Sequence, residues 1–354
     1  MRYSAYSPAR CEKFGTRVLL AALLLCLGCI GCVSSRSIAQ RALGAPNRQF
    51  KPSRQARQFT LLTTNFPLQR VQVGPPPATL ELTVIEPADY GAKVISRFTR
   101  HRSLLTGLRA HYRFQFVIEF SRYQPRPGLE TNNFRGTIFL LPGYGGDRGF
   151  MLGWGLALAQ AGYRAVLVDP RGHGHSTGDR VYFGRIERTD LVQCLDALVQ
   201  RRVCDGRVGA LGISYGAVLA LQWAAVDTRV ESVTAISPYS DPATAVQAYL
   251  NARAPLMPRS MKRKVVGNIV SDLAARWPDL STDTAVRKIQ RPILFVRGDG
   301  DKLCSQEFLE RLHTAAPEGS QAIVIAHANH LDTGLCVNQL EGAVTNWFEL
   351  HLTR

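Results

Sequence analysis

The segment Gly212-Ile213-Ser214-Tyr215-Gly216 constrains this chain more than any other, because it joins a short apolar run to a helix-forming run. The apolar run covers residues 208–211 and the helix-forming run covers residues 217–226. In a strand, turn and helix of this kind, Gly-x-Ser-x-Gly presents the serine at the carboxyl end of the strand. Side chains in place of the two glycines would collide with the neighbouring strand or helix. The pattern therefore predicts that Ser214 is a nucleophile lying above a helix N-terminus, which favours developing negative charge.

Segments with strand and helix character alternate from residue 137 to the end of the chain. Residues 137–141 form a continuous apolar run, which is typical of a strand buried on both faces of a parallel sheet. The alternation predicts an α/β fold with a mostly parallel, doubly wound sheet. Further strands are predicted over 165–168, 208–211, 231–237, 292–297 and 321–326, and helices over 150–161, 185–201, 307–314 and 335–350.

Two segments with strand character precede this alternation. Residues 78–85 alternate polar and apolar side chains, and residues 112–118 form a second strand-like run. We expect these two segments to pair as an antiparallel opening to the sheet. Residues 238–290 interrupt the spacing of the strands and are rich in helix formers and prolines. We expect them to form a small helical cap over the carboxyl edge of the sheet, where ligands bind in such folds; a long surface excursion is the alternative.

The positive charge of the chain is concentrated near its N-terminus. The 354 residues carry a formal net charge of +16, yet no acidic residue lies between Glu12 and Glu81. No module of aromatic and basic residues accompanies this charge, so the pattern favours a solvated tether over a nucleic-acid partner. We therefore expect a basic flexible tether over residues 33–77, closed by a proline-rich stretch, and a folded domain over residues 78–354.

Residues 1–32 have the features of a targeting segment. Basic residues precede an apolar stretch over residues 18–30, which has the length of a signal-peptide core. Gly31-Cys32 at its end resembles the lipobox of bacterial lipoproteins, and Gly28-Cys29 is the alternative. The resemblance implies an exported bacterial protein that is lipidated at Cys32 and anchored to a cell-envelope membrane facing the periplasm. Secretion after cleavage and an uncleaved membrane anchor are the competing interpretations.

Four motifs in the second half of the chain belong together. They are Leu141-Pro142-Gly143-Tyr144-Gly145-Gly146, Asp169-Pro170-Arg171-Gly172-His173-Gly174, the Ser214 turn, and Gly298-Asp299-Gly300-Asp301 followed by His330. From residue 137 onward the chain resembles the α/β-hydrolase superfamily, particularly serine hydrolases of the dienelactone-hydrolase, monoacylglycerol-lipase and serine-aminopeptidase type. The resemblance implies a Ser-His-Asp triad in the chain order nucleophile, acid, histidine.

The resemblance assigns the base and the acid to loops near the C-terminus. The family pattern places the base several residues beyond the last strand, which selects His330 over His327. It places the acid at Asp301, with Asp299 as the second choice. Asp241 is a third possibility, because some lipases take the acid from the end of the preceding strand.

The oxyanion hole implied by the resemblance consists of two backbone amides, those of Tyr144 and Tyr215. Relatives commonly have His-Gly where Pro142-Gly143 stands here, which leaves a main-chain donor unchanged. The Arg171, His173 and His175 motif is mostly structural in relatives, so we assign it no chemistry.

Outside the leader, the chain has four cysteines, and export would favour disulfides among them. We expect Cys304 to pair with Cys336, because both flank triad loops, and Cys194 to pair with Cys204. The cysteine spacing shows no zinc pattern, and no phosphate-binding loop is present, so no cofactor is implied.

Together these features predict a serine hydrolase that cleaves carboxylic ester bonds of a small-molecule substrate through an acyl-serine intermediate. A peptidase or acyltransferase with the same triad is the alternative within enzymes. A catalytically silent binding lipoprotein with this fold is the alternative from another class.

Overall fold

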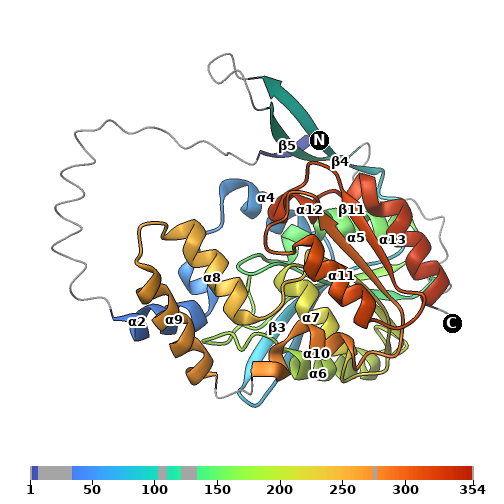
Figure 1. Ribbon diagram of the computed structural model, residues 1–354. Helices are drawn as coiled ribbons and strands as arrows, with labels where there is room; N and C mark the ends of the chain where they lie inside the picture. Colours follow the sequence, from blue (N-terminus) through green and yellow to red (C-terminus); the bar gives the residue numbers. More distant parts are fainter. Residues whose placement is uncertain (1, 7–33, 103–109, 121–133, 274–276, 353–354) are drawn as a thin grey trace.

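The computed structural model describes residues 2–6, 34–102, 110–120, 134–273 and 277–352. Eight strands form one mixed sheet in the order β11-β10-β9-β8-β6-β7-β3-β2 (Figure 1). The strands from β6 to β11 are parallel, whereas β3 runs antiparallel to both β7 and β2. The strands of this sheet are β2 (Leu68–Val73), β3 (Ala78–Ile85), β6 (Thr137–Leu141), β7 (Arg164–Asp169), β8 (Val208–Ile213), β9 (Val230–Ile236), β10 (Ile293–Gly298) and β11 (Gln321–Ile325).

A separate three-stranded antiparallel sheet corrects the predicted opening pair. Its strands are β1 (Arg2–Tyr6), β4 (Ala92–Arg102) and β5 (Ala110–Phe120), with β5 between the other two. Residues 78–85 and 112–118 therefore do not pair with each other. The first segment pairs with β7 and β2 inside the main sheet, while the second pairs with β4. Strand β4 is the nearer partner along the chain, and the sequence analysis did not predict it.

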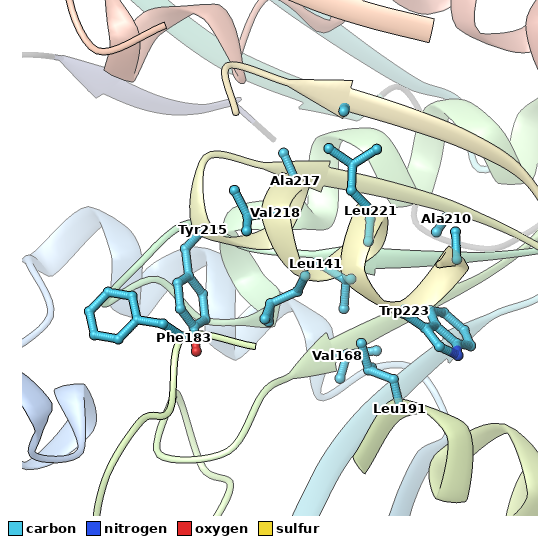
Figure 2. Packing of buried hydrophobic residues seen from close by; sticks show 14 of the residues in the cluster. Leu141, Val168, Phe183, Leu191, Ala210, Tyr215, Ala217, Val218, Leu221 and Trp223 are labelled. Atoms are coloured by element: carbon cyan, nitrogen blue, oxygen red, sulfur yellow. The ribbon is translucent and has the colours of Figure 1, made fainter. Parts of the chain in front are cut away.

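Helices cover both faces of the main sheet, which explains why its central strands are apolar throughout. Along β6, Phe139 and Leu141 face one layer and Ile138 and Leu140 face the other. The first layer contains α6 and α7, and the second contains α5 and α13. Figure 2 shows Trp223 of α7 packed near Leu191 of α6. The predicted doubly wound α/β architecture is confirmed.

The remaining helices follow the strands or lie near the N-terminus. The described helices are α2 (Ser35–Leu43), α3 (Pro46–Gln49), α4 (Arg54–Thr63), η2 (Arg148–Met151), α5 (Leu152–Gln160), α6 (Glu187–Gln200), α7 (Tyr215–Ala224), α8 (Pro242–Arg253), α9 (Arg259–Asp272), η3 (Trp277–Leu280), α10 (Thr282–Val286), α11 (Gln306–Ala315), α12 (His330–Thr333) and α13 (Val337–His351). None of the helices in the described part of the chain has the length and apolar character that a membrane span requires.

The expected flexible tether is wrong for residues 34–73, which form α2, α3, α4 and β2. The hydroxyls of Ser34 and Ser53 cap α2 and α4 by accepting bonds from backbone amides. Buried apolar side chains one turn apart, such as Ala39 and Leu43, then pack α2 against α9. The basic side chains of these helices are exposed, so the positive charge of this segment lies on the outer face of packed helices. We call residues 34–66 the N-terminal clasp.

Helices α8, α9, η3 and α10 occupy the interval between β9 and β10, where the sequence predicted a cap over residues 238–290. Helix α9 lies beside both α8 and α2 (Figure 1). Of the predicted leader, residues 2–6 form β1, whereas residues 7–33, including Cys29 and Cys32, are outside the described residues. Lipidation at Cys32 stays a prediction.

The expected disulfides are absent: Cys194, Cys204, Cys304 and Cys336 are free, buried thiols. Cys304 packs in the core on the α6 and α7 side of the sheet, whereas Cys336 packs on the α5 and α13 side. Because the sheet separates these two sulfurs, their closeness to the triad loops along the sequence does not bring them together. Burial raises the pKa of all four thiols, as expected for cysteines that act as small apolar side chains.

Candidate active site

The turn between β8 and α7 holds Ser214 in a strained backbone conformation. Its φ of 54° and ψ of −109° lie outside the regions that a serine ordinarily adopts. A Cβ on Gly212 would lie 2.1 Å from the carbonyl oxygen of Gly216, and a Cβ on Gly216 would lie 2.0 Å from that of Leu141. Both positions therefore require glycine. The tight turn leaves the serine half-buried at the carboxyl edge of the sheet.

His330 reaches the serine from the loop after β11, at the first residue of α12. Its Nε2 lies 2.8 Å from the Oγ of Ser214. Its Nδ1 lies 2.9 Å from Oδ2 of Asp301 and 3.0 Å from Oδ1. The preceding residue fixes the start of this short helix, because the Oδ1 of Asn329 accepts the amide of Leu331 at 2.8 Å. One imidazole therefore bridges a hydroxyl and a carboxylate.

Asp301 follows β10, and its side chain has no exposure to solvent. Its Oδ1 accepts the backbone amides of Leu303 and Cys304, each at 2.9 Å. Burial by itself raises the pKa of the Asp301 carboxyl, but His330, the Cys304 amide and the Ser237 hydroxyl together hold that pKa below its usual value. The carboxylate therefore stays ionised beside the imidazole.

The other candidate acids and the other candidate base lie elsewhere. Asp299 is exposed, and Asp241 caps α8 by accepting the amide of Thr244 at 2.9 Å. His327 stacks on Tyr112 of β5, with 4.0 Å between the ring centroids. The structure therefore brings together Ser214, His330 and Asp301 and separates them from these three alternatives.

Of the two residues expected to supply the oxyanion amides, Tyr215 belongs to the turn between β8 and α7, which we call the elbow, and Tyr144 follows Gly143, which lies beside Ser214. Within the described residues, no backbone hydrogen bond outside the regular elements uses the amide of Tyr144 or Tyr215. Both side chains are anchored: the hydroxyl of Tyr144 donates to the Ala42 carbonyl at 2.9 Å, and that of Tyr215 donates to Oε1 of Glu187 at 3.1 Å. Their rings meet edge to face with 5.9 Å between centroids. Two fixed backbone segments thus flank Ser214, although their role as an oxyanion hole stays a prediction.

The Arg171, His173 and His175 motif forms contacts of its own. The Arg171 guanidinium donates to both oxygens of Asp190, at 2.7 and 2.8 Å, and both side chains are buried. Burial lowers the pKa of His173 to about 4, and its Nδ1 lies 2.9 Å from the Arg171 carbonyl oxygen. Among the described residues, none of the three bonds to the Ser214, His330 and Asp301 cluster.

One group of potential metal ligands includes His175 of this motif. Oxygens of Glu81 and Asp169 and a ring nitrogen of His175 lie within 4.8 Å of one another. However, Nη1 of Arg148 bonds to Asp169 at 2.5 Å and to Glu81 at 3.2 Å. The guanidinium of Arg70 also pairs with Glu81, at 2.8 Å. Two arginines thus balance the two carboxylates, so this donor set does not fit a cation.

The N-terminal clasp contacts the loops around Ser214, and the sequence analysis missed it. Phe50 packs edge to face on Tyr144 with 6.1 Å between ring centroids and lies 6.5 Å from the ring of Tyr249 on α8. The hydroxyl of Thr60 donates to Oδ2 of Asp147 at 2.8 Å. The Asn47 amide nitrogen donates to the Gly172 carbonyl at 3.0 Å. The caps at Ser34 and Ser53 were the available sequence signal for these helices.

Comparison with known proteins finds one matching family and one curated relative. The family described as X-Pro dipeptidyl-peptidase (S15 family) matches residues 83–265. The uncharacterized protein YqkD of Bacillus subtilis is 27% identical over 169 residues, which are 47% of this chain and 54% of that protein. The chain thus spans about half the length of this curated relative.

Solved structures share the fold at low sequence identity. The Pyrococcus furiosus esterase Pf2001 superposes with a TM-score of 0.56 at 16% identity, covering 81% of this chain and 94% of the esterase. The 2,6-dihydroxy-pseudo-oxynicotine hydrolase superposes with a TM-score of 0.55 at 14% identity, covering 90% of this chain and 80% of that hydrolase. The chain therefore has the α/β-hydrolase fold. Because the family match spans more than half of the chain and includes Ser214, this chain belongs to the X-Pro dipeptidyl-peptidase (S15) family.

Proposed function

We propose that the chain hydrolyses carboxylic esters of small molecules through an acyl-Ser214 intermediate. The observation that carries this proposal is the hydrogen-bonded series from Ser214 through His330 to Asp301, with 2.8 Å between hydroxyl and imidazole and 2.9 Å between imidazole and carboxylate. This arrangement activates a serine hydroxyl, which is otherwise a weak nucleophile at neutral pH.

The proposed reaction has two halves. The Nε2 of His330 accepts the hydroxyl proton as the Oγ of Ser214 bonds to the ester carbonyl carbon. The oxyanion that forms accepts hydrogen bonds from the amides of Tyr144 and Tyr215, and the alcohol leaves with the proton from His330. Water then attacks the carbonyl carbon of the acyl-serine and gives a proton to His330. The bond to Oγ of Ser214 breaks, Oγ takes that proton back from His330, and the acid is released. Asp301 orients the imidazole and stabilises its protonated form.

The charge of the helices near the site favours an ester over a peptide substrate. An enzyme that removes dipeptides must accommodate the ammonium group of the peptide N-terminus, for which a carboxylate is the natural partner. The segment from Pro242 to Ser271, which forms α8 and most of α9, contains no aspartate or glutamate. The family match favours the second candidate, a peptidase acting on X-Pro substrates.

Two chromogenic substrates distinguish these candidates. We expect p-nitrophenyl esters of graded acyl length to be hydrolysed with a higher kcat/KM than Ala-Pro-p-nitroanilide, and a fluorophosphonate probe to label Ser214. Replacement Ser214→Ala should lower kcat/KM by about 10³-fold or more and abolish labelling. The matched control is Ser271→Ala, which alters an exposed serine on α9.

A larger kcat/KM for the anilide would replace the esterase assignment by the peptidase assignment. Failure of the probe to label folded protein would contradict both, and would favour a binding protein with this fold.

A further inference from the structure

A groove between α8 and α9 is lined by four residues, each of which has a side-chain group that can donate hydrogen bonds. Its lining residues are Gln247 and Asn251 on α8 and Arg259 and Arg263 on α9. Each pair is spaced one helical turn apart, so each presents its two side chains on one face. The groove has a volume of about 440 Å³, which is in the range of small-molecule sites.

A buried lysine lies beside this groove and has no carboxylate partner. Lys262 is only 6% exposed, and its Nζ donates to Oδ1 of Asn251 at 3.0 Å. Within the described part of the chain, no ion pair joins Lys262, Arg259 or Arg263 to an acidic side chain. A buried cation with only a neutral partner is costly, and such groups are ordinarily paired.

The elements packed around the groove add positive charge. Helix α2, which packs against α9, carries Arg36 and Arg41 and no acid. The single acid of α9, Asp272, already pairs with Arg180 at 2.5 Å. The α9 side of the groove therefore carries positive charge that no acidic side chain of α9 or α2 offsets.

The amide side chains in the groove are oriented by hydrogen bonds. The Oδ1 of Asn251 accepts from Nε2 of Gln247 at 3.1 Å as well as from Lys262. Since its oxygen is used twice, the free hydrogen-bonding group of Asn251 is its Nδ2 amide, which is a donor.

We propose that this groove binds the phosphate group of an anionic ligand. Two guanidinium groups and a nearby ammonium supply more positive charge and more donors than one carboxylate can use. A phosphate group carries up to two negative charges and at least two free oxygens, and it matches the fork of an arginine. The site is separate from the Ser214 cluster and does not depend on the proposed hydrolysis.

Isothermal titration of the purified chain with inorganic phosphate and with glycerol 3-phosphate, at constant ionic strength, tests this proposal. Binding to lipid is measured separately, by sedimentation of the chain with phosphatidylglycerol vesicles and, for comparison, with phosphatidylcholine vesicles. The variants are Arg259→Gln with Arg263→Gln, and Lys262→Met, which removes the buried charge while keeping an apolar stem. The matched control is Lys264→Gln, which alters an exposed lysine of the same helix.

We expect phosphate to bind at least about tenfold more weakly to both groove variants and with unchanged affinity to Lys264→Gln. The Lys262→Met variant should also keep or raise its thermal midpoint, so that lost binding is not confused with unfolding. If only phosphatidylglycerol vesicles bind, and the groove variants alone lose that binding, the phosphate belongs to a lipid headgroup.

Three results would overturn the proposal. The first is no binding to either phosphate source, and the second is equal affinity for acetate. The third is an equal loss of binding in Lys264→Gln, which would indicate diffuse surface charge instead of a site.

Discussion

At the scale of single residues, hydrogen bonding decides which carboxylate serves the imidazole. Asp299 and Asp301 follow the same strand, yet only Asp301 is buried, accepts two backbone amides and faces His330. Asp299 is exposed. Sequence alone left both open, because a two-residue difference in a loop does not set which side chain points inward.

We expect Asp301→Asn to lower kcat by about 10³- to 10⁴-fold, because an amide holds the imidazole in the wrong tautomer and cannot stabilise its protonated form. Steady-state kinetics with a p-nitrophenyl ester measures this loss, and circular dichroism checks the fold. The matched control is Asp299→Asn, which should stay within about twofold of the parent chain, since an exposed side chain is changed. An equal loss in the control would show that the acid has been wrongly assigned.

Asp332, two residues beyond His330, gives a pH-dependent prediction about stability. Burial raises the pKa of its carboxyl to about 6, although a hydrogen bond from the backbone near Asn329 opposes this. The folded chain therefore holds this proton more tightly than the unfolded chain, whose pKa is about 4. The Asp332 contribution to stability is full below about pH 4 and is lost as the pH rises to about 6.

We expect Asp332→Asn to raise the free energy of unfolding at neutral pH by about 1 to 3 kcal/mol and to remove this pH dependence. Urea denaturation of the variant and of the parent chain, from about pH 4 to about pH 7, measures the free energy of unfolding. Other groups titrate in this range, since burial lowers the pKa of His173 to about 4, so the comparison uses the difference between variant and parent curves. A difference that does not change with pH would contradict the prediction.

At the scale of elements, the N-terminal clasp holds the loops that surround the elbow. It bonds to the loop after β6 through Thr60 and to the loop after β7 through Asn47. Its Phe50 lies between Tyr144, a proposed oxyanion donor, and Tyr249 of α8. An element expected to be a tether thus contacts a residue that we propose as an oxyanion donor.

We expect Phe50→Ala to lower kcat/KM for p-nitrophenyl esters by about tenfold, chiefly through KM, because an aromatic wall of the site is lost. The preferred acyl length should shift toward longer chains, and Phe50→Leu should restore part of the parent profile. Leu61→Ala is the matched control, since Leu61 lies on the same clasp and is 66% exposed. An unchanged acyl-length profile in Phe50→Ala would show that Phe50 only supports the fold.

At the scale of the whole molecule, strand order assembles the site. Ser214 follows β8, Asp301 follows β10 and His330 follows β11, and these strands lie together at one end of the sheet order. Because the strands are parallel, their carboxyl ends share one edge. Ser214 and His330, 116 positions apart in the chain, meet for this reason.

The proposed lipid anchor is also tested on the whole molecule. Expressed in a bacterium, the chain should fractionate with membranes, while a variant carrying both Cys32→Ala and Cys29→Ala should become soluble, because two or more acyl chains make a stable anchor. The two single variants identify which cysteine is modified. A double variant that remains membrane-bound would contradict lipidation.

Local rules explain why the sequence by itself determined the elbow and the parallel strands of the main sheet. Gly212 and Gly216 meet atoms a few residues away or on the adjoining strand, and continuous apolar runs such as residues 137–141 require burial on both faces. The family resemblance added the residues that meet at the carboxyl edge of the sheet, because the order of its motifs implies their roles.

Only the tertiary structure decided the features that depend on partners remote in the chain. The helices of the clasp form where α9 and η2 cover their apolar sides, β5 pairs with β4 instead of β3, and the sheet separates Cys304 from Cys336. Each outcome depends on which surfaces the folded sheet brings within reach, and short-range periodicity carries no information about that.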